Sequence, residues 1–264
     1  MSDARHLPIE GIHRRWVEPA TGRTGDVPLV LLHEGLGSIS SWGPFPQALA
    51  DGCGRPLLVY DRLGYGSSAP HRGPWPAEFM HHEAEVLAGL LAAEGVERAV
   101  LVGHSDGATI ALLYPSCAGV DDAAVDGIVS ISAHVFVEPL GVEAITELRD
   151  GYRERIADRL RRHHADADAT FEAWSEVWLS DRFRPWTIDA DLAAVTCPVL
   201  ALQGAADGYG TVAQVERVAA AVSGPSRVEL LDGVDHWPHK EATTDVIALI
   251  DGFLRAAGDG PGSS

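Results

Sequence analysis

Five consecutive residues, Gly103-His104-Ser105-Asp106-Gly107, decide the fold of this chain. They follow an apolar run and precede a stretch, residues 108–115, that reads as a helix. The pattern Gly-x-Ser-x-Gly between a strand and a helix predicts a sharp turn that exposes the serine hydroxyl at the end of the strand. The glycines lack the Cβ atoms that would collide in so tight a turn. The segment therefore predicts a nucleophilic serine, the alternative being an ordinary strand–turn–helix corner with an incidental serine.

Short apolar runs on both sides of this turn lack polar–apolar alternation, which is typical of strands buried on both faces of a parallel sheet. Stretches with helical spacing separate them, as in right-handed strand–helix–strand units. The expected strands are residues 27–32, 56–60, 98–102, 127–131, 198–202 and 227–231. The expected helices are residues 78–94, 108–115, 212–222 and 244–254. Residues 7–19 are expected to add short antiparallel strands before the parallel set.

The alternation of strands and helices is interrupted after Ser132. No strand is expected within residues 133–190, where residues 143–162 and 168–179 read as helices. We interpret residues 133–190 as an inserted helical cap over one end of the sheet. The arginines between positions 149 and 162 alternate with acidic residues, which favours a solvated helix face, with a substrate-facing cluster as the alternative.

The predicted fold class is therefore α/β, with a mostly parallel central sheet flanked by helices and an inserted helical cap. Residues 1–132 and 191–258 are expected to form one core domain. Residues 259–264 are rich in Gly and Ser and are expected to fray.

The composition excludes several classes of protein. Of the 264 residues, 46% are apolar and 22% are charged, which is ordinary for a packed globule. The formal net charge of −18 disfavours binding to nucleic acid or to anionic membranes, because both are polyanions. No apolar run approaches the length of a membrane-spanning helix. We therefore expect a small-molecule substrate and neither a nucleic-acid nor a membrane partner.

The remaining composition points to a cytoplasmic protein, either monomer or homodimer. The first ten residues contain no apolar core of the kind a secretory signal requires. The cysteines Cys53, Cys117 and Cys197 are too sparse for a disulfide framework or a zinc ribbon. The histidine pairs at 81–82 and 163–164 are sequence neighbours whose side chains point apart on a helix, so no metal site is expected.

A serine hydroxyl is a weak nucleophile near neutral pH and needs a base that is itself oriented by an acid. Two loops downstream of expected strands supply candidates. Asp207 lies on the glycine-rich loop after residues 198–202, and His236 lies on the loop after residues 227–231. Asp235 and Asp106 are alternative acids, and His239 is an alternative base.

Together these segments resemble the α/β-hydrolase fold superfamily over nearly the whole chain. The resemblance includes His33-Glu34-Gly35-Leu36-Gly37 after one strand, residues 61–67 (DRLGYGS) after the next, the Ser105 turn, Asp207 and His236. It implies that Ser105 is the nucleophile, that His236 acts as general base and then acid, and that Asp207 orients His236. It also implies that residues 133–190 are the helical cap over the active site, and that no metal or organic cofactor is required.

The resemblance further implies an oxyanion hole built from two backbone N–H groups. One belongs to Asp106, the residue after the nucleophile, and the other comes from the loop after His33. Family members commonly have His-Gly-x there, whereas this chain has His33-Glu34-Gly35. Gly35 and Leu36 are therefore both candidates for the second donor. Glu34 either braces the loop or faces the pocket and selects substrate.

The implied function is a serine hydrolase that cleaves a small carboxylic ester, lactone or thioester through an acyl-enzyme on Ser105. The same constellation serves carbon–carbon bond hydrolysis of ring-cleavage products, acyl transfer and cofactor-free peroxide chemistry, and some members of the fold are non-hydrolytic ligand-binding or biosynthetic proteins. Haloalkane dehalogenases and epoxide hydrolases of this fold carry aspartate at the turn, so serine argues against them.

Aromatic residues in the expected cap bear on the substrate. Phe171, Trp174 and Trp178 share one helical face. They either pack the cap onto the core or line an apolar pocket, so Trp174 and Trp178 are candidate substrate-binding residues.

Overall fold

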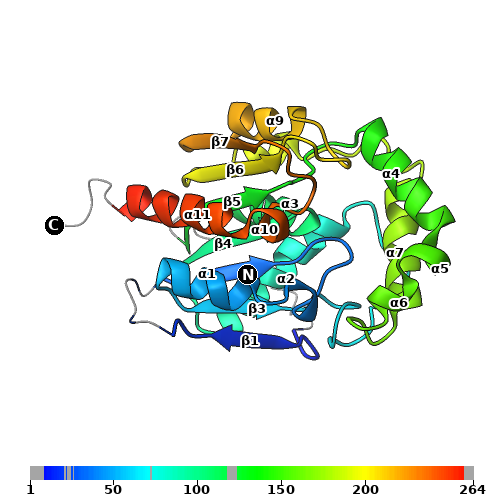
Figure 1. Cartoon of the computed structure of the whole chain (residues 1–264), viewed down its shortest axis with the longest axis horizontal. Helices are drawn as coiled ribbons and strands as arrows, with labels where there is room; N and C mark the ends of the chain where they lie inside the picture. Colours follow the sequence, from blue (N-terminus) through cyan, green and yellow to red (C-terminus); the bar gives the residue numbers. More distant parts are fainter. Residues whose placement is uncertain are drawn as a thin grey trace, which may run out of the picture.

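A mixed sheet forms the centre of the molecule, with helices on both of its faces (Figure 1). The computed structural model describes residues 9–20, 22, 25, 27–71, 73–117 and 124–258. The strands of this sheet, in chain order, are β1 (Arg14–Val17), β2 (Leu29–Leu32), β3 (Leu57–Tyr60), β4 (Ala99–His104), β5 (Val125–Ile131), β6 (Val199–Gly204) and β7 (Ser226–Leu231).

The strand order confirms the predicted α/β class. Within the described residues the order is β1-β3-β2-β4-β5-β6-β7. β1 pairs with β3 in antiparallel fashion, and every other neighbouring pair is parallel. Each of the six strands expected after residue 26 overlaps an observed strand, and β1 falls within the segment expected to be antiparallel. The parallel strands therefore end at a common edge, which collects the loops that follow them.

Burial follows the position of each strand in the sheet. Every residue of β2, β3, β4 and β6 is buried, as their continuous apolar sequences predict. The prediction of burial on both faces is wrong for β7, where Val228 is 36% and Leu230 is 44% exposed. Among the described strands β7 lies at the edge of the sheet beside β6, so its side chains are less completely covered.

Helices cover the sheet in two layers with separate apolar cores. One core joins α2 (Phe79–Ala93) and α3 (Asp106–Leu113) to one face, and the other joins α1 (Phe45–Cys53) and α11 (Thr243–Gly258) to the opposite face. The helices predicted over residues 78–94, 212–222 and 244–254 are confirmed, the middle one as α9 (Ala213–Ala221). The helix expected over 108–115 begins two residues earlier and passes into a short 3₁₀ turn, Tyr114–Ser116.

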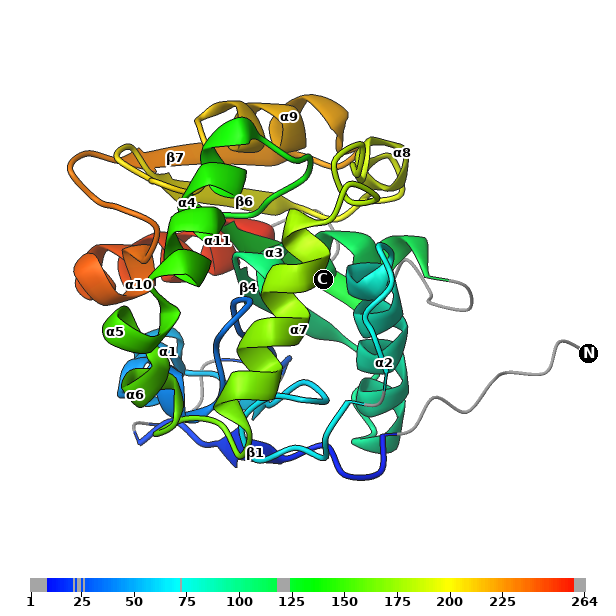
Figure 2. The same ribbon diagram turned by 90° about the vertical axis from the view of Figure 1, so that its right-hand side faces the viewer.

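The segment 133–190 is helical and lies beyond the C-terminal ends of the parallel strands (Figures 1 and 2). An isolated antiparallel β-bridge joins Phe136 to Thr187 in this segment. The helices beginning in this segment are α4 (Pro139–Asp150), α5 (Tyr152–Arg155), α6 (Ala157–Leu160), α7 (Ala167–Leu179) and α8 (Asp189–Leu192).

The prediction of one helix over residues 143–162 is wrong, because the helix is interrupted at two positions. Gly151 ends α4, consistent with the low helix propensity of glycine. Ile156 has a φ of −133°, which separates α5 from α6. Ile156 and Leu160 are both buried, so tertiary packing overrides the local helical pattern in this stretch.

Two expectations concern residues that the structure does not describe. The tail at 259–264 and the start of the segment 7–19 lie outside the described ranges. Within the described parts, no helix combines the length and apolar character needed to cross a bilayer.

Candidate active site

Ser105 stands on the sharp turn between β4 and α3 that the sequence predicts. Its backbone has φ 53° and ψ −121°, a region that residues with a Cβ rarely occupy. A Cβ on Gly103 would lie 2.3 Å from the carbonyl oxygen of Gly107, and a Cβ on Gly107 would lie 2.2 Å from that of Leu32. Both glycines are therefore required by close backbone approach, and the turn presents Ser105 at the edge of the sheet.

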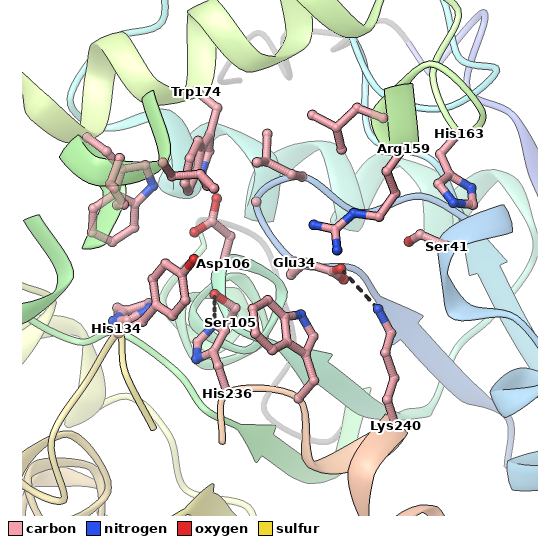
Figure 3. Close-up of a pocket in the computed structure, with 18 of the residues that line it drawn as sticks. Glu34, Ser41, Ser105, Asp106, His134, Arg159, His163, Trp174, His236 and Lys240 are labelled. Atoms are coloured by element: carbon pink, nitrogen blue, oxygen red, sulfur yellow. Dashed lines mark hydrogen bonds and ion pairs between the residues drawn. The ribbon is translucent and has the colours of Figure 1, made fainter. Parts of the chain in front are cut away.

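The structure brings Ser105, His236 and Asp207 together, although they come from three different loops. Nε2 of His236 lies 3.1 Å from Oγ of Ser105 (Figure 3). Nδ1 of His236 lies 2.9 Å from each carboxylate oxygen of Asp207. All three residues are buried, so these hydrogen bonds are shielded from bulk water.

Asp207 is held as a carboxylate in this arrangement. Burial raises its pKa, but the hydrogen bond and the charge of His236 and the N–H of Tyr209 outweigh burial, so the pKa lies below its ordinary value. A carboxylate can only accept, so Nδ1 of His236 carries the hydrogen and donates it. Nε2 is then free to accept the proton of the Ser105 hydroxyl.

Asp235 and His239, an alternative acid and the alternative base, do not contact Ser105 or the His236 ring as a triad member would. Oδ1 of Asp235 accepts the N–H groups of Gly208 (2.9 Å) and His236 (2.8 Å), so Asp235 braces the loop and does not bond the imidazole. His239 is buried with its ring packed 4.6 Å from that of Trp42. Among the described residues its nitrogens have no hydrogen-bond partner.

The loop after β2 is fixed from behind by His33 and Arg62. The Arg62 N–H donates to Nε2 of His33 (3.1 Å), and Nδ1 of His33 donates to the carbonyl of Glu34 (2.8 Å). Burial and the charge of Arg62 hold the pKa of His33 at about 3, so its imidazole is neutral. Arg62 Nη2 also donates to the Glu34 carbonyl (2.9 Å), so this carbonyl accepts two hydrogen bonds.

The candidate oxyanion donors lie around the same cavity as Ser105. Gly35, Leu36 and Asp106 all line it. Within the described part of the chain, none of their N–H groups donates a hydrogen bond to another residue. Asp106 is the first residue of α3, whose N-terminal N–H groups have no acceptor inside the helix.

Glu34 contacts two neighbouring side chains and also faces the cavity. Its Oε1 lies 3.8 Å from Nζ of Lys240 and its Oε2 lies 3.5 Å from Nδ1 of His104 (Figure 3 shows the Lys240 pair). Burial raises its pKa, but the contact with His104 and the charge of Lys240 bring it well below its ordinary value. Glu34 is therefore a braced carboxylate that also lines the cavity.

A buried charged cluster behind the turn was not predicted. Oδ2 of Asp106 lies 3.8 Å from Nη2 of Arg62, and the Arg62 guanidinium stacks 4.4 Å from the centre of the Tyr65 ring. Burial raises the pKa of Asp106 to about 6 against the charge of Arg62. Burial likewise raises the pKa of Glu83 to about 7. The available signal was Glu83 itself, a carboxyl group on the apolar stripe of its helix.

The cavity above Ser105 has a volume of about 360 Å³. Trp174 and Trp178 line it, whereas Phe171 stacks on Tyr152 with 4.1 Å between ring centres. A Cβ on Gly35 would lie 2.2 Å from Nε1 of Trp174, so glycine is required where this indole crosses the loop. The tryptophans therefore both pack the segment 133–190 onto the core and face the cavity.

Sequence reasoning missed His134 and Tyr209, which line the cavity, and it named Arg159, which also lines it, only within the alternative of a substrate-facing arginine cluster. His134 follows β5, and its ring lies 5.6 Å from that of His236. Burial and the charge of His236 hold its pKa at about 3. Its place after a parallel strand is the same signal that identified Asp207. No group of three His, Cys, Asp or Glu side chains able to hold a metal ion occurs in the portion of the chain that is described.

Comparison with known proteins places this geometry in a family. Residues 29–249 match the model of the alpha/beta hydrolase family. The chain is 26% identical to epoxide hydrolase A of Mycobacterium tuberculosis, over 95% of this chain and 96% of that protein. It is 32% identical to the putative carbamate hydrolase RutD of Klebsiella pneumoniae, over 86% of this chain and 91% of that protein.

Solved structures show the same fold. An esterase from Thermogutta terrifontis superposes with a TM-score of 0.70 at 19% identity, covering 93% of each chain. The enol-lactonase of Burkholderia xenovorans LB400 superposes with a TM-score of 0.67 at 20% identity, covering 92% of this chain and 96% of that one. Fold and family model agree with the strand order and the turn described above. This chain belongs to the alpha/beta hydrolase family.

Proposed function

We propose that this protein is a serine hydrolase that cleaves a small carboxylic ester, lactone or thioester through an acyl-enzyme on Ser105. The supporting observation is the hydrogen-bonded series from Ser105 through His236 to Asp207 at the floor of a cavity. A serine hydroxyl that touches an imidazole, itself oriented by a carboxylate, is the arrangement that acyl transfer requires.

The reaction follows from the positions of these groups. Oγ of Ser105 attacks the substrate carbonyl while its proton passes to Nε2 of His236. The imidazolium that forms is stabilised by the Asp207 carboxylate. The new oxyanion accepts hydrogen bonds from the N–H of Asp106 and from that of Gly35 or Leu36. As the bond to the leaving group breaks, His236 donates the proton to the leaving group.

A water molecule then hydrolyses the acyl-enzyme with the same residues. His236 takes a proton from the water that attacks the acyl carbonyl, and then returns it to Oγ of Ser105 as the carboxylic acid departs.

One relative is named an epoxide hydrolase, so opening of an epoxide is an alternative reaction to consider. Epoxide hydrolases of this fold use an aspartate nucleophile at the turn, where this chain has Ser105. We therefore favour acyl chemistry.

A panel of 4-nitrophenyl esters tests this proposal. The purified protein should hydrolyse short-chain esters, and Ser105→Ala should lower kcat by a factor on the order of 10³ or more. Ser116→Ala is a matched control, because Ser116 is exposed on the turn after α3 and does not line the cavity. Turnover that persists in Ser105→Ala, or no turnover of any ester, would contradict the proposal.

A further inference from the structure

We propose that the cavity selects substrates that carry a carboxylate group, and that Arg159 is the residue that binds this group. The inference rests on the proposed function and adds a substrate class to it. The acyl chemistry takes place at Ser105, while the carboxylate lies at the other end of the cavity.

Arg159 lies on α6 and lines the cavity, and its guanidinium is directed into it (Figure 3). Arg161 of the same stretch differs, since it pairs with Asp158 at 2.9 Å and Asp168 at 3.3 Å and does not line the cavity. Within the described residues, the guanidinium of Arg159 has no hydrogen bond and no carboxylate within 4.0 Å. The substrate-facing alternative left open by the sequence therefore applies to Arg159.

The cationic side chains of the cavity lie on the side away from Ser105. Asp106, His134 and Trp174 lie near Ser105, whereas Arg159 and Lys240 lie at the opposite side (Figure 3). Lys240 lies 3.8 Å from the carboxylate of Glu34, so its charge is largely offset.

His163, which also lines this side, makes a hydrogen bond of 2.8 Å with the hydroxyl of Ser40. Burial and the charge of Arg162 lower the pKa of His163, which favours its neutral form. Within the described residues Arg159 is thus a cation at this end that forms no ion pair, in a protein whose net charge is −18.

The chemistry of the guanidinium identifies the ligand. Its planar fork of N–H donors matches a carboxylate with two parallel hydrogen bonds. Arg159 is an exposed residue, and Ile145, Leu148 and Leu160 line the cavity into which its guanidinium is directed, so apolar side chains flank the proposed charge pair. A phosphate dianion fits the same fork, but the carboxylates of Glu34 and Glu241 at the cavity wall repel a double charge more strongly than a single one.

Matched esters test the proposal. 4-Nitrophenyl hydrogen adipate carries a terminal carboxylate, 4-nitrophenyl heptanoate carries a methyl group there, and 4-nitrophenyl 6-aminohexanoate carries an ammonium group. A second pair, 3-carboxyphenyl butyrate and phenyl butyrate, places the carboxylate on the leaving group. We expect kcat/KM for the carboxylate member of at least one pair to exceed that of its neutral partner by about 10- to 100-fold.

Arg159→Gln should remove this preference, mainly through KM, so that the carboxylate ester and the neutral ester of the preferred pair are hydrolysed with similar kcat/KM. Arg153→Gln is the matched control, because it removes the same charge from an exposed neighbour that does not line the cavity. A preference that survives in Arg159→Gln, or wild-type protein that favours the neutral or ammonium esters in both pairs, would overturn the proposal.

A calorimetric titration separates this proposal from the hydrolase proposal. If the neutral esters are hydrolysed, the hydrolase proposal stands and the ratio above decides the role of Arg159. If no ester is hydrolysed, binding of adipate decides it, with inorganic phosphate as the comparison anion. Adipate should bind wild-type protein and Arg153→Gln with equal affinity, and Arg159→Gln about 10-fold or more weakly. Equal affinity for all three proteins, or stronger binding of phosphate than of adipate, would contradict the proposal.

Discussion

Both carboxylate oxygens of Asp207 lie 2.9 Å from Nδ1 of His236. Oδ1 of Asp207 also accepts the N–H groups of Tyr209 at 2.8 Å and Gly210 at 3.2 Å, so the carboxylate cannot rotate freely. This fixes both the orientation and the tautomer of the His236 ring. In the proposed mechanism, the basicity of Nε2 toward Ser105 depends on this relationship.

Replacing Asp207 by Asn should therefore lower kcat by about 10³- to 10⁴-fold, because an amide can donate to Nδ1 and so favours the wrong tautomer. Steady-state ester hydrolysis measures the effect. Asp235→Asn is the matched comparison, since the Asp235 carboxylate accepts the backbone N–H groups of Gly208 and His236 in the same loops. A loss in Asp235→Asn as large as that in Asp207→Asn would contradict the assignment of the acid.

Glu83 should make the protein less stable as the pH rises. Its pKa is raised from 4.5 to about 7 in the folded state, first by burial. Between these values the folded protein keeps a proton that the unfolded chain has lost, so raising the pH favours unfolding. Relative to Glu83→Gln, the wild type should lose about 3 kcal/mol of unfolding free energy between pH 4.5 and 7.

Chemical denaturation of both proteins across this pH range measures the difference. Glu85→Gln is the control, because Glu85 is exposed on the same helix. A difference between wild type and Glu83→Gln that does not change with pH would show that Glu83 ionises normally in the folded state.

The turn around Ser105 should not tolerate a Cβ at Gly107. Gly107→Ala places this atom 2.2 Å from the Leu32 carbonyl oxygen, so the backbone must move, at a cost of about 3 kcal/mol or more. Gly252→Ala is the contrast, since a Cβ there meets nothing within 4 Å. In the helix interior it should stabilise the protein by up to about 1 kcal/mol. Similar unfolding free energies for the two variants would contradict this account of the turn.

Gly35 and Trp174 should be energetically coupled. Gly35→Ala forces the Trp174 indole away from a contact of 2.2 Å and should cost about 1–3 kcal/mol. In a background with Trp174→Leu the same alanine should cost much less, because the colliding ring is gone. A double-mutant cycle of unfolding free energies measures the coupling. If the changes in unfolding free energy of the two single variants add up to that of the double variant, then Gly35 and Trp174 are not energetically coupled.

Glu34→Gln should change substrate choice through Lys240. Removing the carboxylate leaves the Lys240 charge unopposed at 3.8 Å, and the preference for carboxylate-bearing esters should rise by about two- to fivefold. Neutral esters report any damage to the loop itself, so the ratio of the two activities is the measurement. An unchanged ratio would show that Glu34 only braces the loop.

The sequence was informative where the candidate site coincides with strong local signals. Gly103 and Gly107 mark a turn that only glycine permits, and Asp207 and His236 lie on the loops that follow two strands. Parallel topology then requires these loops to share one edge of the sheet. The residues are far apart in sequence, but the rule that joins them is local.

The features that the sequence did not reveal depend on packing between distant segments. The break at Ile156 follows from burial of that side chain, which helical spacing alone does not encode. The Arg62–Asp106 pair and the buried Glu83 depend on how α2 packs beside α3. The direction of the Arg159 side chain depends on where α6 lies relative to the cavity. The alternation of arginines and acidic residues in this stretch does not encode that position, and it is also typical of a solvated helix face.

Covalent labelling of Ser105 tests the central claim most directly. A fluorophosphonate probe reacts with a serine whose hydroxyl is activated by an adjacent base, and intact-mass measurement followed by peptide mapping locates the adduct. We predict one adduct, on the peptide containing Ser105, with labelling lost in Ser105→Ala and strongly slowed in Asp207→Asn. No adduct on the folded wild-type protein, or equal labelling of Ser105→Ala, would contradict the claim that Ser105 is the nucleophile.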